Sequence, residues 1–288
     1  MDYWKQTISG LLICLSAMLF AQPDLARVDS LTQVLEDAPS PTEKGRISLA
    51  LARAYQSVDL LQSRNYARQA LSWLDSQDPL RADALDQLGR FYFYQTQFDS
   101  ALYYFRQARD LLALAQDTFR IASLNISIGS VLLQQSHYTE AISIFIENLK
   151  YFEPRQDMVN AAKCYSNLAT AFAQMSNFEK AIEYSRKALT IFRQQGMDQF
   201  TMITLPNLAT QFMQNDQLDS ANHYFQLAET LATRYGNKRS LALIYTSLGD
   251  LNLESEHLEL ARDYTLKSIQ LKQELNQAKG ISQAYHNL

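Results

Sequence analysis

Glycine and proline are scarce in this sequence of 288 residues, which contains 8 glycines and 6 prolines. Average usage would give about 30 or more of these two residues in a chain of this length. A β-sandwich or barrel needs many turns and a nucleotide-binding fold needs glycine-rich loops, so the scarcity argues against both. Hydrophobic residues make up 47% of the chain, which is well away from the composition of disordered proteins. The composition therefore favours long helices joined by short connections.

Cysteine and net charge are equally sparse. Two cysteines are too few for a disulfide framework, and a formal net charge of -4 provides no basic surface for nucleic acid. The sequence contains no Cys-x-x-Cys, His-Glu-x-x-His, Gly-x-Ser-x-Gly or glycine-rich phosphate motif. Its four histidines show no spacing that would place two of them on one metal. We therefore expect no enzyme activity, no catalytic residue, no metal, no cofactor and no nucleic-acid partner.

Residues 1–21 have the pattern of a secretory signal peptide. Lys5 precedes an apolar run over 8–20, and the small residue Ala21 follows it. The run is shorter than the roughly 20 residues that span a bilayer as a helix, although retention as a signal anchor is the alternative. Cys14 follows a large residue, whereas a lipidated cysteine normally follows a small one. We expect cleavage near Ala21 and export to a periplasmic or other extracytoplasmic location.

A 40-residue period runs through the rest of the chain. A leucine or isoleucine followed by glycine or alanine recurs at 88–89, 128–129, 168–169, 208–209 and 248–249. A column of alanines follows these pairs at the same spacing, at Ala101, Ala141, Ala181, Ala221 and Ala261. Apolar residues within each unit are three and four apart, which indicates helix, and the alternation of a strand is absent. Self-similarity of this kind predicts an array of helical repeats.

Each unit is expected to hold two helices, here called A and B. In the second unit we expect helix A over 80–95 and helix B over 98–115. The glycine or alanine of the first column lets helix B approach helix A closely, and the alanine column lets the next helix A pack on helix B. One helix pair cannot bury its apolar face alone, whereas a stack of pairs can. The predicted fold is an all-α solenoid of stacked antiparallel helix pairs.

The two columns resemble the tetratricopeptide repeat family. Its pattern has a leucine followed by a small residue, then an aromatic, and a second aromatic three residues before an alanine in helix B. The residues that match it include Leu88, Gly89, Phe91, Phe98 and Ala101 in one unit and Leu168, Ala169, Phe172, Phe178 and Ala181 in another. The family period is usually 34, and the longer 40-residue variety occurs in several scaffold and sensor proteins. The resemblance implies a right-handed superhelix over 42–288, with about six repeats and the first half of a seventh.

Both ends of the array depart from the pattern. A lone capping helix is expected within 22–41, ahead of a first repeat whose own pattern is degenerate. Pro206 falls inside helix A of the fifth repeat, where we expect it to kink or delay the helix. The sequence stops at Leu288, one residue before the place where every earlier register has glycine or alanine. We therefore expect the natural reading frame to continue beyond this residue.

The resemblance also implies where a partner binds, because helix A lines the concave groove in this family. The expected contact residues are Gln87, Arg90, Ser127, Lys163, Asn167, Thr170, Asn207, Thr210, Ser247 and Asp250. Most are small or amide polar residues, and amides pair with both the N–H and the C=O groups of an extended peptide. A groove floor with few charges favours a protein or peptide segment as the partner. A purely structural role for Asn167 and Asn207 is the alternative.

Two functions remain open on this basis. The chain resembles the input half of bacterial receptors, in which a signal, a cap helix and 40-residue repeats precede a membrane helix and a kinase or DNA-binding output domain. It would then be the sensor region of a longer signal-transduction protein, with membrane contact only through a segment downstream of Leu288. The alternative is a stand-alone secreted or periplasmic adaptor. An apolar stretch of about 20 residues beyond Leu288 would identify the sensor.

Overall fold

The computed structural model describes residues 25–56 and 58–275, and this part of the chain is helical, without a β-strand. The predicted signal over 1–21 and the half-repeat at the C-terminal end lie outside the described residues. Among the residues that are described, no helix is both long enough and apolar enough to cross a membrane. The helices form two compact units, Met1–Tyr151 and Phe152–Leu288, which we call unit 1 and unit 2.

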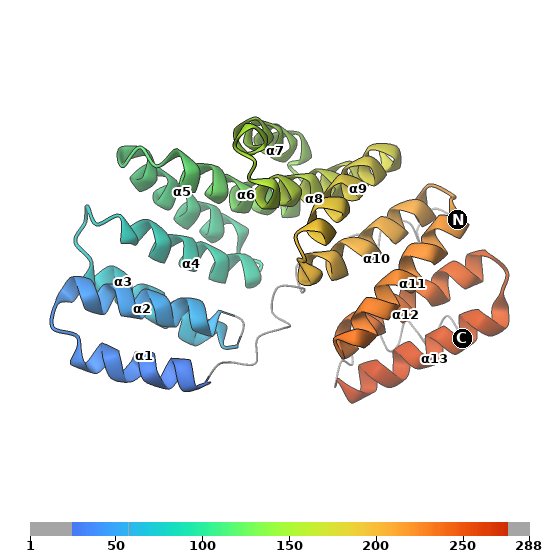
Figure 1. The fold of residues 1–288 in the computed structure, drawn as a ribbon, viewed down its shortest axis with the longest axis horizontal. Helices are drawn as coiled ribbons and strands as arrows, with labels where there is room; N and C mark the ends of the chain where they lie inside the picture. The colour runs from blue at the N-terminus through green and yellow to red at the C-terminus, as the bar shows by residue number, and fades with distance from the viewer. Residues whose placement is uncertain (1–24, 57, 276–288) are drawn as a thin grey trace. The chain divides into compact units, whose positions relative to one another are not determined.

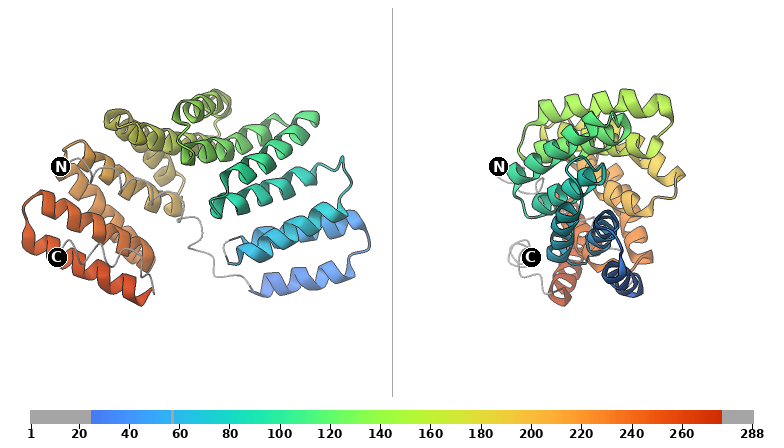
Figure 2. Two further views of the ribbon diagram at one scale, coloured as in Figure 1. Left: turned by 180° about the vertical axis from the view of Figure 1, so that it is seen from behind. Right: turned by 90° about the vertical axis from the view of Figure 1, so that its left-hand side faces the viewer.

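In each unit, consecutive helices lie side by side and run antiparallel (Figures 1 and 2). Those of unit 1 are α1 (Leu25–Asp37), α2 (Pro41–Tyr55), α3 (Leu60–Trp73), α4 (Leu80–Tyr94), α5 (Phe98–Leu114), α6 (Thr118–Gln134) and α7 (Tyr138–Phe152), of which the last residue falls in unit 2. Unit 2 contains the short 3-10 helix η2 (Glu153–Arg155), then α8 (Met158–Gln174), α9 (Phe178–Gln194), α10 (Asp198–Gln214), α11 (Leu218–Arg234), α12 (Lys238–Glu254) and α13 (Leu258–Glu274). The even-numbered helices from α2 to α12 are A helices, and the odd-numbered helices from α3 to α13 are B helices.

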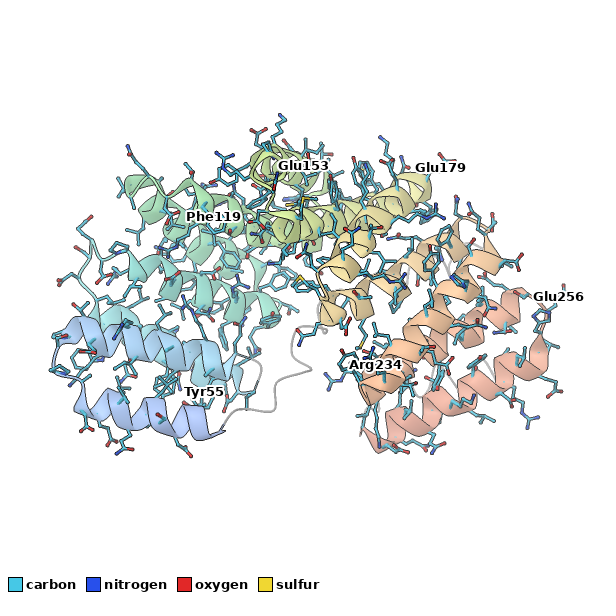
Figure 3. The ribbon with its side chains drawn as sticks, viewed as in Figure 1. Tyr55, Phe119, Glu153, Glu179, Arg234 and Glu256 are labelled. Carbon is cyan, nitrogen blue, oxygen red and sulfur yellow. The ribbon has the colours of Figure 1, made fainter. Side chains whose placement is uncertain are left out.

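The turns after α4 repeat one geometry at a constant spacing. A residue with positive φ occupies the same place in each turn, at Thr96, Gln116, Ser136, Gln156, Ser176, Gly196, Asp216, Gly236 and Glu256, the last of which is labelled in Figure 3. In the first of these turns the N–H of Thr96 donates to Phe93 O and the N–H of Gln97 donates to Tyr92 O. This pair of bonds is a Schellman motif, which satisfies the last carbonyls of a helix. The two helices of a repeat and the two turns that follow them therefore form a regular 40-residue module.

The predicted packing of helix B on helix A is confirmed. A Cβ atom placed on Gly89 of α4 would come within 2.4 Å of the ring of Phe105 of α5. Gly129 of α6 lies in the same way against Phe145 of α7, at 2.6 Å. The alanine column is buried as well: Ala101, Ala141, Ala181 and Ala221 are fully inaccessible, and Ala261 is 7% exposed. The small residues therefore set how closely neighbouring helices approach.

A helices of the same unit also contact one another. In unit 1, α2 contacts α4 and α4 contacts α6, while in unit 2 α10 contacts α12. Within each unit, a B helix also packs on the A helix that follows it, as α3 does on α4 and α11 on α12. The core runs between the two layers and is lined by aromatic pairs, such as Tyr92 on Tyr104 and Phe212 on Tyr224.

Two prolines lie at places where the sequence alone did not determine the helix boundary. Ser40 caps α2, its hydroxyl accepting from the N–H of Glu43, and Pro41 is the first residue of that helix. Proline suits this position because the N–H it lacks would be unpaired in any case. Pro206 lies buried inside α10, which begins at Asp198 and continues to Gln214. The prediction that Pro206 delays this helix is therefore wrong, and α10 packs against both α9 and α11.

Candidate functional site

The A-helix face, meaning the outer surface of the A-helix layer in each unit, carries the residues expected to contact a partner. In unit 2, Asn167 of α8, Asn207 of α10 and Ser247 of α12 occupy the same register on the A helices. All three are partly exposed. Their side chains make no hydrogen bond to any other residue in the described part of the chain. Polar side chains that are partly exposed and make no internal hydrogen bond remain available to an external partner.

The expected contact residues one helical turn further along the A helices have different environments. The Thr170 hydroxyl donates to Ser166 O at 3.1 Å, which uses its one donor within the helix. The Thr210 hydroxyl is buried and has no hydrogen-bond partner among the described residues. Asp250 lies near the ammonium group of Lys272, a buried side chain of α13 that donates to Thr246 Oγ1 at 2.9 Å. Burial lowers the pKa of Lys272, and the Asp250 carboxylate acts in the opposite direction.

One turn before the amides, the face becomes partly apolar. The Lys163 ammonium donates to Asn160 Oδ1 at 3.1 Å and lies 5.7 Å from the centre of the Phe200 ring. Ile203 on α10 is partly buried, and Leu243 on α12 is 38% exposed. In unit 2 a row of unpaired amide and hydroxyl groups thus borders a row of apolar side chains. This combination can hold both the backbone and the apolar side chains of a bound segment.

The predicted residues of unit 1 are in a different environment. Gln87 of α4 is only 7% exposed, and its Oε1 has no hydrogen-bond partner in the described residues. Arg90 donates from Nε to Asp86 Oδ2 at 2.8 Å, and this carboxylate raises the pKa of Arg90. Ser127 of α6 is partly exposed. Only Ser127 therefore resembles the accessible amides of unit 2.

An ionic network links three A helices of unit 1. Asp83 of α4 lies 3.3 Å from the guanidinium of Arg53 on α2 and 2.5 Å from that of Arg120 on α6. Asp117, which also caps α6, lies 3.8 Å from Arg120. The prediction of a floor with few charges is therefore wrong for unit 1. Sequence reasoning missed Arg120 because it lies outside the columns of expected contact residues, and it missed Arg53 because the first repeat is out of register with the 40-residue period.

The described residues include no group of three histidine, cysteine, aspartate or glutamate side chains that could bind a metal ion. Cys164 is a buried cysteine within α8. The A-helix face offers hydrogen bonding by amides and hydroxyls, ion pairing in unit 1, and apolar contact in unit 2.

A stack of helix pairs with these two layers is an α-solenoid repeat protein. Two models of the tetratricopeptide repeat family match the chain, one over residues 81–112 and the other over 120–194. The chain therefore contains tetratricopeptide repeats over these residues. Repeats of this kind form protein–protein interaction modules and are generally non-catalytic scaffolds. No curated protein matches the chain in sequence.

Solved structures with the same fold come from several systems. The chain is similar to pilF of Pseudomonas aeruginosa, with 23% identity, a TM-score of 0.57, and coverage of 86% of this chain and 99% of that one. It is also similar to a Rap protein complexed with competence and sporulation factor, with 15% identity, a TM-score of 0.68, and coverage of 90% and 78%. A third is aspartyl phosphate phosphatase F from Bacillus subtilis, with 16% identity, a TM-score of 0.61, and coverage of 92% and 74%. Identities this low establish the fold alone.

Proposed function

We propose that the chain is an exported, non-enzymatic interaction module that binds an extended peptide segment on the A-helix face of unit 2. We further propose that it is the input region of a longer signalling protein, with a stand-alone adaptor as the alternative. The N-terminal pattern of Lys5, the apolar run over 8–20 and Ala21 supports export.

The observation that carries the binding proposal is the pair Asn167 and Asn207. They occupy equivalent positions on α8 and α10, are partly exposed, and have no side-chain hydrogen bond in the described part of the chain. Each amide has one carbonyl acceptor and two N–H donors. An extended peptide presents N–H and C=O groups in alternation, so two such amides on adjacent helices can bind its backbone without selecting its side chains. Selectivity would then come from contacts with Ile203 and Leu243.

The similar solved structures support ligand binding by this fold in general and do not define how a ligand binds to this chain. One similar structure is that of a Rap protein in complex with competence and sporulation factor, so this fold can hold a ligand. Another neighbour is named as a phosphatase. Our proposal of a non-enzymatic role rests instead on this chain, whose A-helix face offers amides, hydroxyls and apolar groups rather than an activated nucleophile.

The test begins with peptides selected by display on the wild-type chain, whose affinity is then measured by calorimetry. Replacing Asn167 and Asn207 with alanine should weaken binding about tenfold or more, because two hydrogen bonds of about 1 kcal/mol each are lost. The matched control is Asn222→Ala, which removes an exposed asparagine from the B helix α11. It should leave the affinity unchanged.

Two results would contradict the binding proposal. Unchanged affinity of the double variant would show that the amides do not contact the peptide. A fall of more than a few degrees in its melting temperature would show that they are structural. The sensor proposal has its own test, which is the native reading frame: an apolar stretch of about 20 residues beyond Leu288 supports it, and a stop codon there supports the adaptor.

A further inference from the structure

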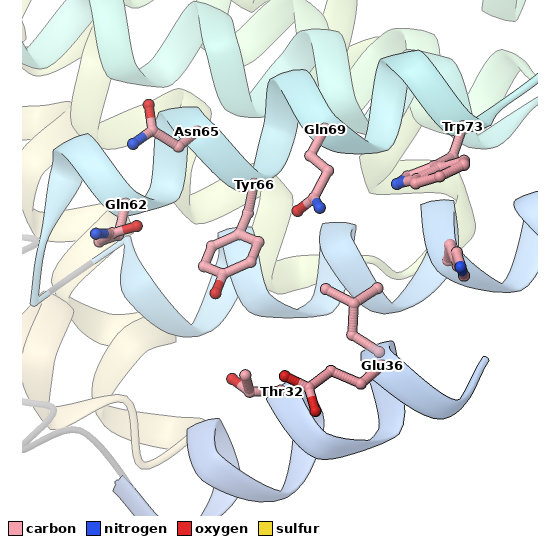
Figure 4. A pocket seen from close by; sticks show the side chains of 9 residues that line it. Thr32, Glu36, Gln62, Asn65, Tyr66, Gln69 and Trp73 are labelled. Carbon is pink, nitrogen blue, oxygen red and sulfur yellow. The ribbon is translucent and has the colours of Figure 1, made fainter.

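A cavity of about 570 Å³ lies in unit 1 between α1 and α3, away from the A-helix face (Figure 4). Helix α3 contributes Gln62, Tyr66, Gln69 and Trp73, and α1 contributes Thr32 and Glu36 from the opposite side. Its volume is within the range of pockets that bind ligands of a few hundred daltons. Nothing in the role of the A-helix face requires this cavity.

The wall formed by α3 alternates between amide and aromatic side chains. Gln62, Tyr66, Gln69 and Trp73 are spaced by four, three and four residues, so all four lie on one stripe of the helix. Tyr66 and Trp73 are seven residues apart, which is about 10.5 Å along the helix axis. The wall therefore presents two aromatic residues whose positions are about 10 Å apart along the helix axis, with an amide residue before each of them.

The two rings are held in place by neighbouring side chains. Tyr66 stacks on Tyr55 of α2 with ring centres 5.5 Å apart. The Lys44 ammonium of α2 lies 5.1 Å from the centre of the Trp73 ring, yet Trp73 remains 37% exposed. Rings that are already fixed lose little conformational entropy when a ligand packs on them.

The polar groups of the cavity are available for hydrogen bonds. The side chains of Gln62, Gln69, Trp73 and Glu36 make no hydrogen bond to any described residue. The two amides and the indole offer N–H donors. Glu36 contributes the carboxylate of the α1 side (Figure 4). The site thus has N–H donors along the α3 wall, the Glu36 carboxylate on the α1 wall, and the Lys44 ammonium beside Trp73.

We propose that this cavity binds a proline-rich segment in the polyproline II conformation. Such a segment rises 3.1 Å per residue with three residues per turn, so prolines one turn apart are about 9.3 Å apart. This distance is close to the rise of about 10.5 Å along α3 between Tyr66 and Trp73, so each ring can pack on one proline. Proline has no N–H, so the ligand presents mainly carbonyl acceptors, which the donors of Gln62, Gln69 and Trp73 complement.

The charge of the cavity sets a further preference. Glu36 is an exposed carboxylate on the wall opposite the donors and favours a basic residue beside it, whereas the Lys44 ammonium disfavours one beside Trp73. The proposal does not rest on peptide binding by Asn167 and Asn207, which belong to unit 2. Failure of either site leaves the other unaffected.

The test uses the full chain with Trp4→Phe, which leaves Trp73 as its one tryptophan. Its fluorescence is titrated with a decaproline peptide carrying one terminal arginine, and with a glycine–serine decapeptide carrying the same arginine. We expect a saturable shift in Trp73 emission, with a dissociation constant below about 1 mM, for decaproline alone. Gln69→Ala should weaken binding by about fivefold or more, since it removes one hydrogen bond. The matched control Gln107→Ala, on the next B helix α5, should have no effect.

A second measurement covers the aromatic contact. The anisotropy of labelled decaproline should show that Trp73→Ala abolishes binding while circular dichroism shows unchanged helix content. The proposal is overturned if decaproline causes no shift, if the glycine–serine peptide binds equally well, or if Gln107→Ala weakens binding as much as Gln69→Ala. A shift caused by cellohexaose and not by decaproline would also overturn it and would assign the cavity to a saccharide.

Discussion

Gly89 of α4 lies directly against the ring of Phe105 of α5, so closely that a Cβ atom at this position would come within 2.4 Å of Cε1 and 2.5 Å of Cδ1. Phe105 is 1% exposed and therefore has no space into which it can move. This contact sets the distance between the two helices of one repeat.

Replacing Gly89 with valine should destabilise unit 1 by about 2–3 kcal/mol, because the added methyl groups overpack a closed contact. Urea unfolding followed by circular dichroism measures the loss. Adding Phe105→Ala to this variant creates space at the same place, so the double variant should lose less than the sum of the two single changes. Additive losses would mean that the ring and the glycine do not oppose each other.

Thr96 offers a stabilising change. It holds a φ of 58° in the turn after α4, a conformation that is unfavourable for a β-branched residue. Gly196 occupies the equivalent place with a φ of 64°. We expect Thr96→Gly to raise the free energy of unfolding by about 0.5–1 kcal/mol. The reverse exchange, Gly196→Thr, should lower the stability of unit 2, and a gain from both changes would contradict this account.

The ionic network of unit 1 should contribute measurably to its stability. Asp83→Asn removes the carboxylate that Arg53 and Arg120 share, leaving Arg120 only its longer pair with Asp117, and should cost about 1 kcal/mol at low salt, with a smaller cost in about 1 M salt because of screening. The control is Glu147→Gln, which breaks a solvent-exposed pair with Lys150 on α7. If both variants lose the same stability, the link between three helices has no special effect.

Tyr245 should make the stability of unit 2 depend on pH in the alkaline range. Burial and the Glu229 carboxylate, which accepts its hydrogen bond, raise the pKa of Tyr245 to about 12 from an ordinary value of 10.0. A raised pKa means that the folded state favours the protonated phenol. The resulting stabilisation is complete below pH 10 and is lost as pH rises towards 12.

The measurement compares wild type with Tyr245→Phe in urea at several values of pH. The difference in stability between them should be constant below pH 10 and should shrink between pH 10 and 12. Tyr103→Phe serves as the control because this exposed side chain has no such carboxylate partner among its described contacts. A difference that stays constant to pH 12 would exclude the role of Glu229.

The fold could be predicted from the sequence because its packing residues repeat at fixed intervals. Gly89 and Ala101 indicated where two helices meet, and helix A was expected over 80–95 where the structure has Leu80–Tyr94. The left-handed turns gave no such signal, because seven of the nine residues at this place are not glycine. Turn conformation here follows from the helices on both sides rather than from the identity of the turn residue.

The candidate site was less predictable. The period gives the direction of a side chain around its helix, so Asn167 and Asn207 could be placed on one face. The period does not show how far a neighbouring helix covers that side chain. The burial of Gln87 could therefore not be predicted. Arg53 escaped notice because the first repeat is out of register: the interval from its Leu51 to Leu88 is three positions shorter than the period of the later repeats.

The evenly spaced left-handed turns allow whole repeats to be exchanged by recombination. Deleting residues 197–236 would join Gly196 to Asn237, and this junction is the same Gly-Asn step that Gly236 and Asn237 form in the intact chain. Helix α9 would then be followed by α12 through a turn already compatible with both of its flanks. A deletion of half a repeat would keep the turn but place a B helix where an A helix belongs, opposite the wrong column of small residues. Unequal crossing-over can therefore change the length of this protein in steps of one whole repeat without requiring a new loop.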